Sequence, residues 1–299
     1  MRISSFSHIN YLYDQSSRTH VEMNKAQQQT ASGLKSETFS GIAPDSNRLL
    51  RFESEKNLLE SEITNTDYTL DHMESMYGAL NQINDLSNNI LGDMTAALGG
   101  AGTSSANLSI LATQWRTDLE SMLNADFAGR YLFSGTATDA PPVDIAGSGY
   151  GGQTAPSVAD TSYYQGDDGV LAYKAGNASR IEYGLSANDE TFEQMFRAID
   201  LMITAPGDQA ALAEAYDLMR RATDGLGIMK QNLSYQTSSI QQTQEHNLAQ
   251  AEALDILVSD LKDADLAEAT IKLSELQTQL EASYSSLTIM LKISLFDYL

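Results

Sequence analysis

Glycines at positions 147, 149 and 152 have the spacing of a loop that binds the phosphates of a dinucleotide. Such a loop needs an apolar strand before it and a helix after it, because the helix N-terminus holds the phosphates. Neither pattern flanks these glycines, so we interpret the segment as an ordinary loop. The four histidines, which are potential zinc ligands, are dispersed at positions 8, 20, 72 and 246 and match no zinc motif.

Two groups of carboxylates are candidates for cation binding. Asp167 and Asp168 lie between two glycines, but the chain lacks the regularly spaced oxygen ligands of an EF-hand, so a tight turn is the simpler prediction. Asp263, Asp265 and Glu268 do not share one face of a helix, which is typical of a solvated acidic surface. No nucleophile is paired with a base and no phosphate-binding motif occurs. The sequence therefore predicts a protein that is not an enzyme and has no metal and no cofactor.

The composition limits the partners. With 42% hydrophobic residues among 299, the chain can build a core. The 40 acidic and 18 basic residues give a net charge of -22, which argues against nucleic acid and membrane as partners. No cysteine is present, so disulfides and thiolate metal sites are excluded. The N-terminus does not have the pattern of a secretory signal peptide, and no apolar run reaches the roughly 18 residues of a membrane span.

The clearest structural pattern is an apolar stripe near the C-terminus, within the stretch from Leu261 to Leu299. Its members are spaced by three and four residues, or by seven, and therefore lie on one face of a helix. They are Leu266, Ala269, Leu273, Leu276, Leu280, Leu287, Met290 and Leu291. A long helix in water gains most of its stability from packing, so this one needs a partner in the chain or in another subunit.

The N-terminal segment from about residue 7 to 32 also has no helix breaker, and Gly33 follows where a C-terminal cap would lie. Its apolar seam is poor. Ile9, Leu12 and Met23 share their face with polar residues, so the helix can bury little apolar area. Two interpretations stay open: a solvent-exposed helix, or a segment that packs among copies of itself.

The middle of the chain predicts further long helices and one insertion. A helix is expected from about Ser46 to Leu98, with the 3.5-residue repeat of a coiled coil, and another from about Ser105 towards Phe127, ended by Gly129. The single tryptophan is expected to pack between helices. The segments SYYQ, GVLAYKA and SRIEYGL, with a Gly-Asn turn between the last two, predict strands of a small β-rich module.

Helices are expected to resume near residue 189, to break at Pro206-Gly207 and to restart at Asp208. A soft point is predicted at residues 224–227, and a joint at 262–265, because the heptad stripe changes register there. The predicted fold class is therefore mainly α: a long helical bundle or coiled-coil rod built from both chain termini, with a small β-rich inserted domain.

Several segments resemble flagellins and flagellar hook-associated proteins. QQQTASGLKSE and the nearby IAPDS resemble the start of this superfamily, and LKDADLAEATIKLSELQTQLEASYSSLTIMLKISLFDYL resembles its C-terminal end. Residues 127–143, FAGRYLFSGTATDAPPV, and residues 164–169, YQGDDG, resemble the hook-filament junction proteins within the superfamily. The resemblance covers both helical ends and the borders of the insertion.

The resemblance implies three regions: terminal axial helices at 1–42 and 262–299, a helical rod domain at 43–129 and 188–261, and a β-rich outer domain at 130–187. It implies that the two chain ends pack together near the axis of a tubular assembly. The apolar positions of these ends are the predicted assembly interface. They are Ile9, Leu12, Met23, Leu266, Leu273, Leu276, Leu280, Leu287 and Leu291.

The function implied by the resemblance is that of a structural adaptor between the hook and the filament. The chain would be exported unfolded from the cytoplasm through the type III channel of the flagellum and would then lie in the extracellular flagellum. The implied partners are a ring of its own copies, another hook-associated protein, flagellin, and an export chaperone at the C-terminal helix. Two alternatives are a flagellin that forms the filament itself and an extracellular enzyme or adhesin carried by the β insert.

Overall fold

The structure is a computed structural model that describes residues 2–99, 105–174 and 180–296, without the side chains of 2–6, 8–9, 105–106 and 290–296. The chain is mainly helical and carries two small antiparallel sheets, which confirms the predicted fold class. It divides into two compact units. We call residues 1–60 with 249–299 the terminal unit, and residues 61–248 the central unit.

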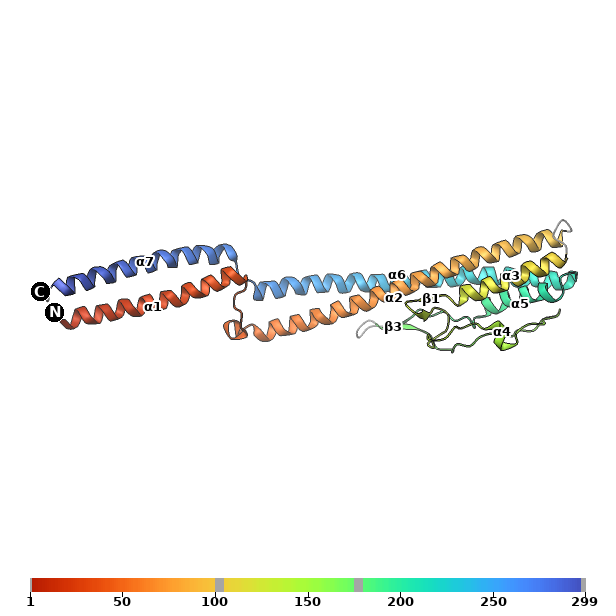
Figure 1. Cartoon of the computed structure of the whole chain (residues 1–299), viewed down its shortest axis with the longest axis horizontal. Helices are drawn as coiled ribbons and strands as arrows, with labels where there is room; N and C mark the ends of the chain where they lie inside the picture. Colours follow the sequence, from red (N-terminus) through yellow and green to blue (C-terminus); the bar gives the residue numbers. More distant parts are fainter. Residues whose placement is uncertain (1, 100–104, 175–179, 297–299) are drawn as a thin grey trace. The chain divides into compact units, whose positions relative to one another are not determined.

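Seven α-helices and one short 3-10 helix are present in the part of the chain that the structure describes (Figure 1). The α-helices are α1 (Arg2–Ser32), α2 (Ser46–Leu98), α3 (Ser105–Leu123), α4 (Ile145–Ser148), α5 (Glu190–Thr204), α6 (Gln209–Lys262) and α7 (Leu266–Phe296). The 3-10 helix, Phe39–Ile42, lies in the connection between α1 and α2.

Three helix ends lie where the sequence predicts them, because capping residues occupy these positions. Gly33 has a φ of +73°, a left-handed conformation that glycine adopts without strain, and its N–H donates to the carbonyl of Gln29 at 2.9 Å. The Asp189 carboxylate accepts a hydrogen bond from the backbone N–H of Thr191 at the start of α5. Asp265 caps α7 in the same way, so the predicted joint at 262–265 is confirmed.

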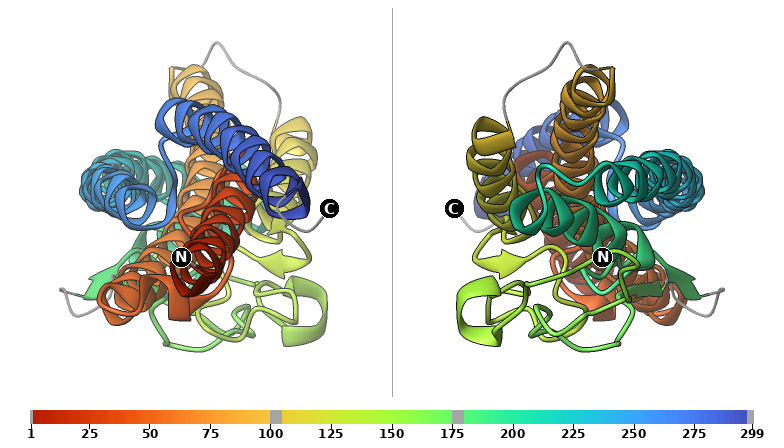
Figure 2. Two further views of the ribbon diagram at one scale, coloured as in Figure 1. Left: turned by 90° about the vertical axis from the view of Figure 1, so that its left-hand side faces the viewer. Right: turned by 90° about the vertical axis from the view of Figure 1, so that its right-hand side faces the viewer.

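In the terminal unit, α1 and α7 lie side by side along most of their length (Figures 1 and 2). The two helices run in opposite directions, because α1 leads away from the N-terminus and α7 leads back to the C-terminus beside it (Figure 1). The implied pairing of the two chain ends is therefore confirmed.

In the central unit, one apolar core joins α2, α3, α5 and α6, and α3 packs along α5 (Figure 2). Trp115 is 7% exposed within this core, so the single tryptophan packs between helices as predicted. The largest fully buried core side chains from the helices are Met73, Met76, Leu80, Ile83, Ile90, Met94, Leu108, Phe192 and Phe196. Polar contacts also join α2 to α6, among them a hydrogen bond between the hydroxyl groups of Ser87 and Thr223.

The insertion between α3 and α5 contains two short hairpins. Strand β1 (Asp126–Phe127) pairs with β2 (Arg130–Tyr131), and β3 (Ala172–Lys174) pairs with β4 (Arg180–Glu182), both antiparallel. The first hairpin turns through Ala128 and Gly129, which both have positive φ, as a two-residue turn of type I′ requires. The hydroxyl groups of Tyr173 and Thr66 share a hydrogen bond of 2.6 Å, which fastens the second hairpin to α2.

Three expectations for the central unit were wrong in detail. Helix α3 ends at Leu123 and not near Phe127, because the Asn124 side chain exchanges two hydrogen bonds with the backbone of Val143 and Phe127 enters the first hairpin. The SYYQ segment forms no strand and contributes only an isolated bridge between Tyr164 and Val143. The GVLAYKA and SRIEYGL segments do form β3 and β4, while the Gly-Asn turn between them lies outside the described residues.

The predicted soft point at 224–227 is the third difference, since α6 continues through it without a break. One of its two glycines, Gly225, has a packing role. A Cβ added at Gly225 would lie 2.7 Å from the Thr191 hydroxyl oxygen, so a side chain here would collide with the first turn of α5. Glycine therefore permits the close approach of two helices rather than flexibility.

The two segments that resemble junction proteins bind each other. The Asp167 carboxylate accepts hydrogen bonds from the backbone N–H groups of Thr136, at 2.6 Å, and Gly169, at 3.1 Å. These bonds, with one from the Thr136 hydroxyl as the largest contribution, lower the pKa of Asp167. A Cβ at Gly135 would lie 2.2 Å from the Asp167 carboxylate, so this contact requires glycine. The pair Asp167-Asp168 is therefore part of a structural turn, as predicted.

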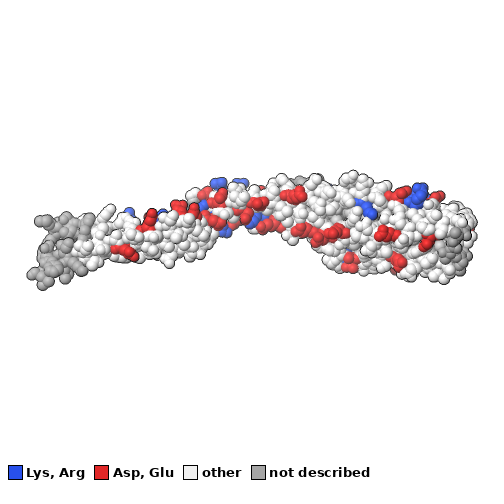
Figure 3. Space-filling model, turned by 90° about the horizontal axis from the view of Figure 1, so that it is seen from above, with Lys and Arg blue, Asp and Glu red and all other residues white. Residues whose placement is uncertain are grey.

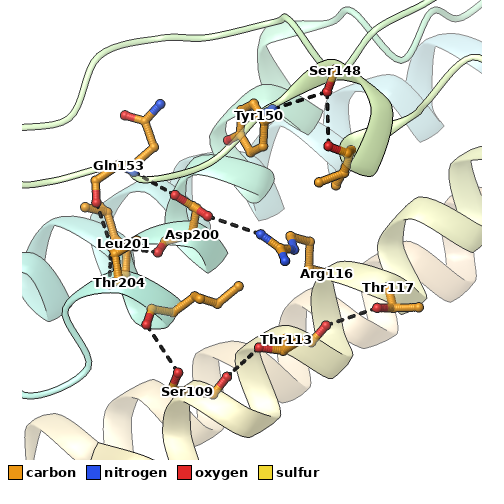
Figure 4. A network of polar contacts seen from close by, with 12 residues as sticks. Ser109, Thr113, Arg116, Thr117, Ser148, Tyr150, Gln153, Asp200, Leu201 and Thr204 are labelled. Carbon is orange, nitrogen blue, oxygen red and sulfur yellow. Dashed lines mark hydrogen bonds and ion pairs between the residues drawn. The ribbon is translucent and has the colours of Figure 1, made fainter.

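Buried carboxylates on α5 hold the irregular loop that follows α4 (Figure 4). Asp200 is 1% exposed; it accepts a hydrogen bond from the backbone N–H of Gln153 at 2.7 Å and pairs with Arg116 at 3.3 Å. Thr204, one turn further along α5, donates to the carbonyl of Gln153 at 2.6 Å. Glu193 accepts from the backbone N–H of Asp160 at 3.0 Å. This polar face of α5 is therefore covered by the loop and not by solvent.

Candidate assembly surface

The contact between α1 and α7 is made largely by small side chains. On α1 the buried residues are Ser16, Thr19 and Ala26, and on α7 they are Ala269, Leu276 and Leu280. Burial of an apolar side chain contributes roughly 25 cal/mol for each Å² removed from water, so the α1 side of this contact contributes little. The polar seam predicted for the N-terminal helix is thus present, and it faces α7.

Several larger apolar side chains of the same two helices are exposed. Val21 on α1 is 67% exposed, and Ile271 on α7 is 62% exposed. The others with high exposure are Tyr11, Tyr13, Leu266, Tyr284 and Ile289. The pair therefore buries only small residues of α1, besides Leu276 and Leu280 of α7, and leaves several large apolar residues of both helices exposed, unlike a helix pair that is complete on its own.

The predicted interface residues do not share one environment. Leu276 and Leu280 are buried between the helices, and Leu266 is 50% exposed. The half-buried ones are Leu12, Met23, Leu273 and Leu287. Ile9 lies in α1 and Leu291 in α7, but their side chains are outside the described residues. The structure thus brings part of the predicted set together within one chain and leaves the rest at the edge of the contact.

Sequence reasoning missed the outward residues. Ile271 and Ile289 are 18 positions apart, which is five full turns of an α-helix, so they lie on the same face of α7. The residues between them on that face are Glu275, Thr278, Ala282 and Ser285, so no apolar stripe in the sequence marks it.

Acidic groups dominate the charged surface. On the face shown in Figure 3, Asp and Glu side chains outnumber Lys and Arg side chains. No group of three or more potential metal ligands occurs among the residues that the structure describes. Of the carboxylates considered for cation binding, Asp265 caps α7 and Asp263 accepts a hydrogen bond from Ser259 at 2.6 Å. No described helix is long and apolar enough to serve as a transmembrane segment.

The glycines and histidines have structural environments. Asp144 caps the short helix α4, which Gly149 ends with a φ of +73°, so the glycine-rich segment forms a capped turn. The ring of His20 on α1 hydrogen-bonds the Tyr284 hydroxyl on α7 at 2.7 Å. His72 is 3% exposed and packs edge-on against Phe127 and Tyr183.

The buried His72 predicts a specific pH dependence of stability. Burial, with a smaller effect from Arg130, lowers its pKa from 6.5 to about 4. Because the folded-state pKa lies below the unfolded one, the stabilisation is complete above pH 6.5 and is lost as the pH falls towards 4. We expect His72→Leu to remove about 2 kcal/mol of the stability difference between pH 7 and 4.5. Urea unfolding at both pH values measures this difference, and the exposed His246→Leu variant is the control. Equal pH dependence in His72→Leu and the unaltered chain would contradict the assignment.

Comparison with known proteins shows what the C-terminal part of this chain resembles. Residues 210–299, which cover all but the first residue of α6 and all of α7, match the bacterial flagellin C-terminal helical region. This part of the chain is therefore similar to that of bacterial flagellins. No curated protein sequence gives a significant match.

Two solved structures match this chain over most of its length. The chain resembles an inferred flagellar hook-associated protein from Vibrio parahaemolyticus, with a TM-score of 0.61 and 16% sequence identity over 75% of this chain and 100% of that one. It also matches FlgL from Bacillus cereus, with a TM-score of 0.48 and 15% identity over 71% of this chain and 99% of that one. The predicted resemblance to flagellins and hook-associated proteins is therefore confirmed, by sequence over the C-terminal region and by fold over most of the chain.

Proposed function

We propose that this chain is a structural adaptor that joins the hook to the filament of a bacterial flagellum. The observation that carries an assembly role is the surface of the α1–α7 pair, on which the large apolar side chains of Val21, Ile271 and Ile289 are exposed. Such a surface is costly in a free monomer and is compensated when copies pack together. The similarity of residues 210–299 to the bacterial flagellin C-terminal region supports a flagellar assembly.

The choice of adaptor over filament subunit is supported by the central unit. The segments at 127–143 and 164–169, which resemble junction proteins, bind each other through Asp167 and Thr136. The fold is similar to that of an inferred hook-associated protein. A junction protein must present two different end surfaces and must not add copies of itself without limit. The Debye screening length at physiological salt is only about 8 Å. Repulsion between acidic subunits therefore does not by itself stop copies of the chain from adding to one another.

In this proposal, residues 1–42 and 262–299 form the axial part, 43–129 and 188–261 the rod, and 130–187 the outer part. The partners are a ring of its own copies, another hook-associated protein, flagellin and an export chaperone at the C-terminal helix. The chain passes from the cytoplasm to the extracellular flagellum. An enzyme or adhesin in the β insert has no support, since no convergent polar pocket was predicted there.

A flagellin is the second candidate, because residues 210–299 match the flagellin C-terminal region. Growth of filaments from purified protein separates the two. We expect the chain alone to form no long filaments under conditions in which a flagellin, run as the positive control, polymerises. Micrometre-long filaments from this chain would favour the flagellin assignment.

The terminal pair is also expected to be the least stable part of the free monomer. Its α1 seam of Ser16, Thr19 and Ala26 buries little apolar area, whereas Leu80 and Ile83 of α2 are fully buried. Amide exchange should therefore be faster in residues 7–32 and 266–289 than in residues 61–95, and should slow on assembly. Equal protection of both regions in the monomer would contradict the expectation.

A further inference from the structure

The α1–α7 pair is attached to the rest of the terminal unit by two connections of different length. Helix α6 leads into α7 through residues 263–265 only, whereas α1 leads into α2 through residues 33–45. A long connection by itself places the end of α1 loosely, because a flexible chain segment samples many end positions. In the structure, hydrogen bonds to the short connection fix the start of the long one.

The start of the long connection is hydrogen-bonded to the short one. The backbone N–H of Lys35 donates to the carbonyl of Lys262, and the backbone N–H of Ala264 donates to the carbonyl of Gly33, both at 2.8 Å. Leu34 and Asp263 therefore lie opposite each other as an antiparallel bridge. We call residues 33–35 and 262–264 the linker bridge. It joins the residues that directly follow α1 to the last residue of α6 and to the connection that leads into α7.

Side chains reinforce the linker bridge. The Lys35 ammonium group donates to the carbonyl of Asp260 in the last turn of α6, where a cation also interacts favourably with the helix dipole. The Gln29 side chain donates to the Lys35 carbonyl at 2.9 Å. Lys262 pairs with Glu53 of α2 at 3.3 Å. The bridge thus contacts α1, α2 and α6.

The seam between α1 and α7 specifies its own register weakly. The buried side chains of α1 are the small Ser16, Thr19 and Ala26, and the larger Leu12 and Met23 are only half-buried, so few interlocking side chains of α1 oppose a shift along α7 by one turn. Large interlocking side chains or buried polar pairs normally prevent such shifts. The polar contact from His20 to Tyr284 is exposed and contributes little to register.

We propose that the linker bridge sets the register of α1 on α7, so that the exposed apolar side chains of both helices are presented in one fixed pattern. The proposal concerns the free chain and does not depend on the hook-filament assignment. It makes the backbone N–H groups of Lys35 and Ala264 the determining donors.

Distances between spin labels on the two helices test this proposal. The chain has no cysteine, so Asp14→Cys and Lys272→Cys, both exposed, place one label on each helix, well separated along the length of the pair, without background. We expect one narrow distance distribution in the otherwise unaltered chain. Lys35→Pro and, separately, Ala264→Pro each remove one bridge donor, and each should add a second population displaced along the helix by about 5 Å, the rise of one turn.

Two controls separate the bridge from its surroundings. Glu37→Pro places proline in the same connection outside the bridge, and Lys35→Ala keeps the backbone donor but removes the ammonium group; both should keep the single distance. Unchanged melting of the central unit shows that each variant folds. A single narrow distance in both bridge-proline variants, or several distances in the parent chain, would overturn the proposal.

Discussion

Leu280→Asp should reduce incorporation of this chain into the flagellum by at least about tenfold while leaving the central unit folded. Leu280 is 5% exposed, between α7 and α1. An unpaired carboxylate there costs several kcal/mol, or the two helices separate to hydrate it. Every tenfold change in an equilibrium constant corresponds to about 1.4 kcal/mol. A cost of several kcal/mol for burying the carboxylate therefore lowers the population of the packed α1–α7 pair by more than tenfold.

The matched control is Gln279→Asp, the neighbouring exposed position on the same helix, which adds the same charge without burying it. Quantitative immunoblots of isolated flagella measure incorporation, and thermal melting of the purified protein measures the central unit. Normal incorporation of Leu280→Asp would refute the assembly role of the α1–α7 pair. A collapse of the central melting transition would show instead that the variant is misfolded.

The helical architecture was predictable because its signals are local. Gly33 and Asp189 mark helix ends by their own capping chemistry, and the change of stripe near Lys262 marked the joint between α6 and α7. Capping and periodicity act within a few residues, so they can be read from one sequence. The pairing of the chain ends came from the resemblance and not from these local signals.

The parts that sequence reasoning missed depend on distant contacts. A glycine such as Gly225 normally weakens a helix, but here Thr191, more than 30 residues away in the sequence, packs directly against it. Asp200 and Glu193 have the spacing of a solvent-facing stripe, yet an irregular loop covers them with its backbone donors. Helix α3 stops early because Asn124 binds Val143. Tertiary contacts decide these cases, and no local pattern reports them.

The candidate surface was only partly predictable for a related reason. Leu276 and Leu280 were correctly placed on the apolar face of α7. Which face of α7 meets α1, however, depends on the side chains that α1 presents at the contact. Its small residues leave Ile271 and Ile289 on the outside. The sequence of one helix reveals its apolar stripe. It does not reveal which of its apolar side chains the partner helix leaves exposed.

The proposed adaptor role predicts a large and specific defect in cells that lack this chain. A filament subunit that cannot bind the hook directly leaves the cell without polymerising, because the heterologous surface that joins hook to filament is missing. We therefore expect complete hooks without filaments. Expression of the unaltered chain should restore filaments, whereas the Leu280→Asp variant should not.

The most direct test is to measure flagellin in the culture medium of such deletion cells together with electron microscopy of their hooks. The adaptor account predicts hooks of normal length, no filaments, and abundant unpolymerised flagellin in the medium. If this chain were itself the flagellin, the deletion would remove the filament and no other flagellin would accumulate outside the cell. That second result, or filaments of normal length on the deletion cells, would contradict the proposed function.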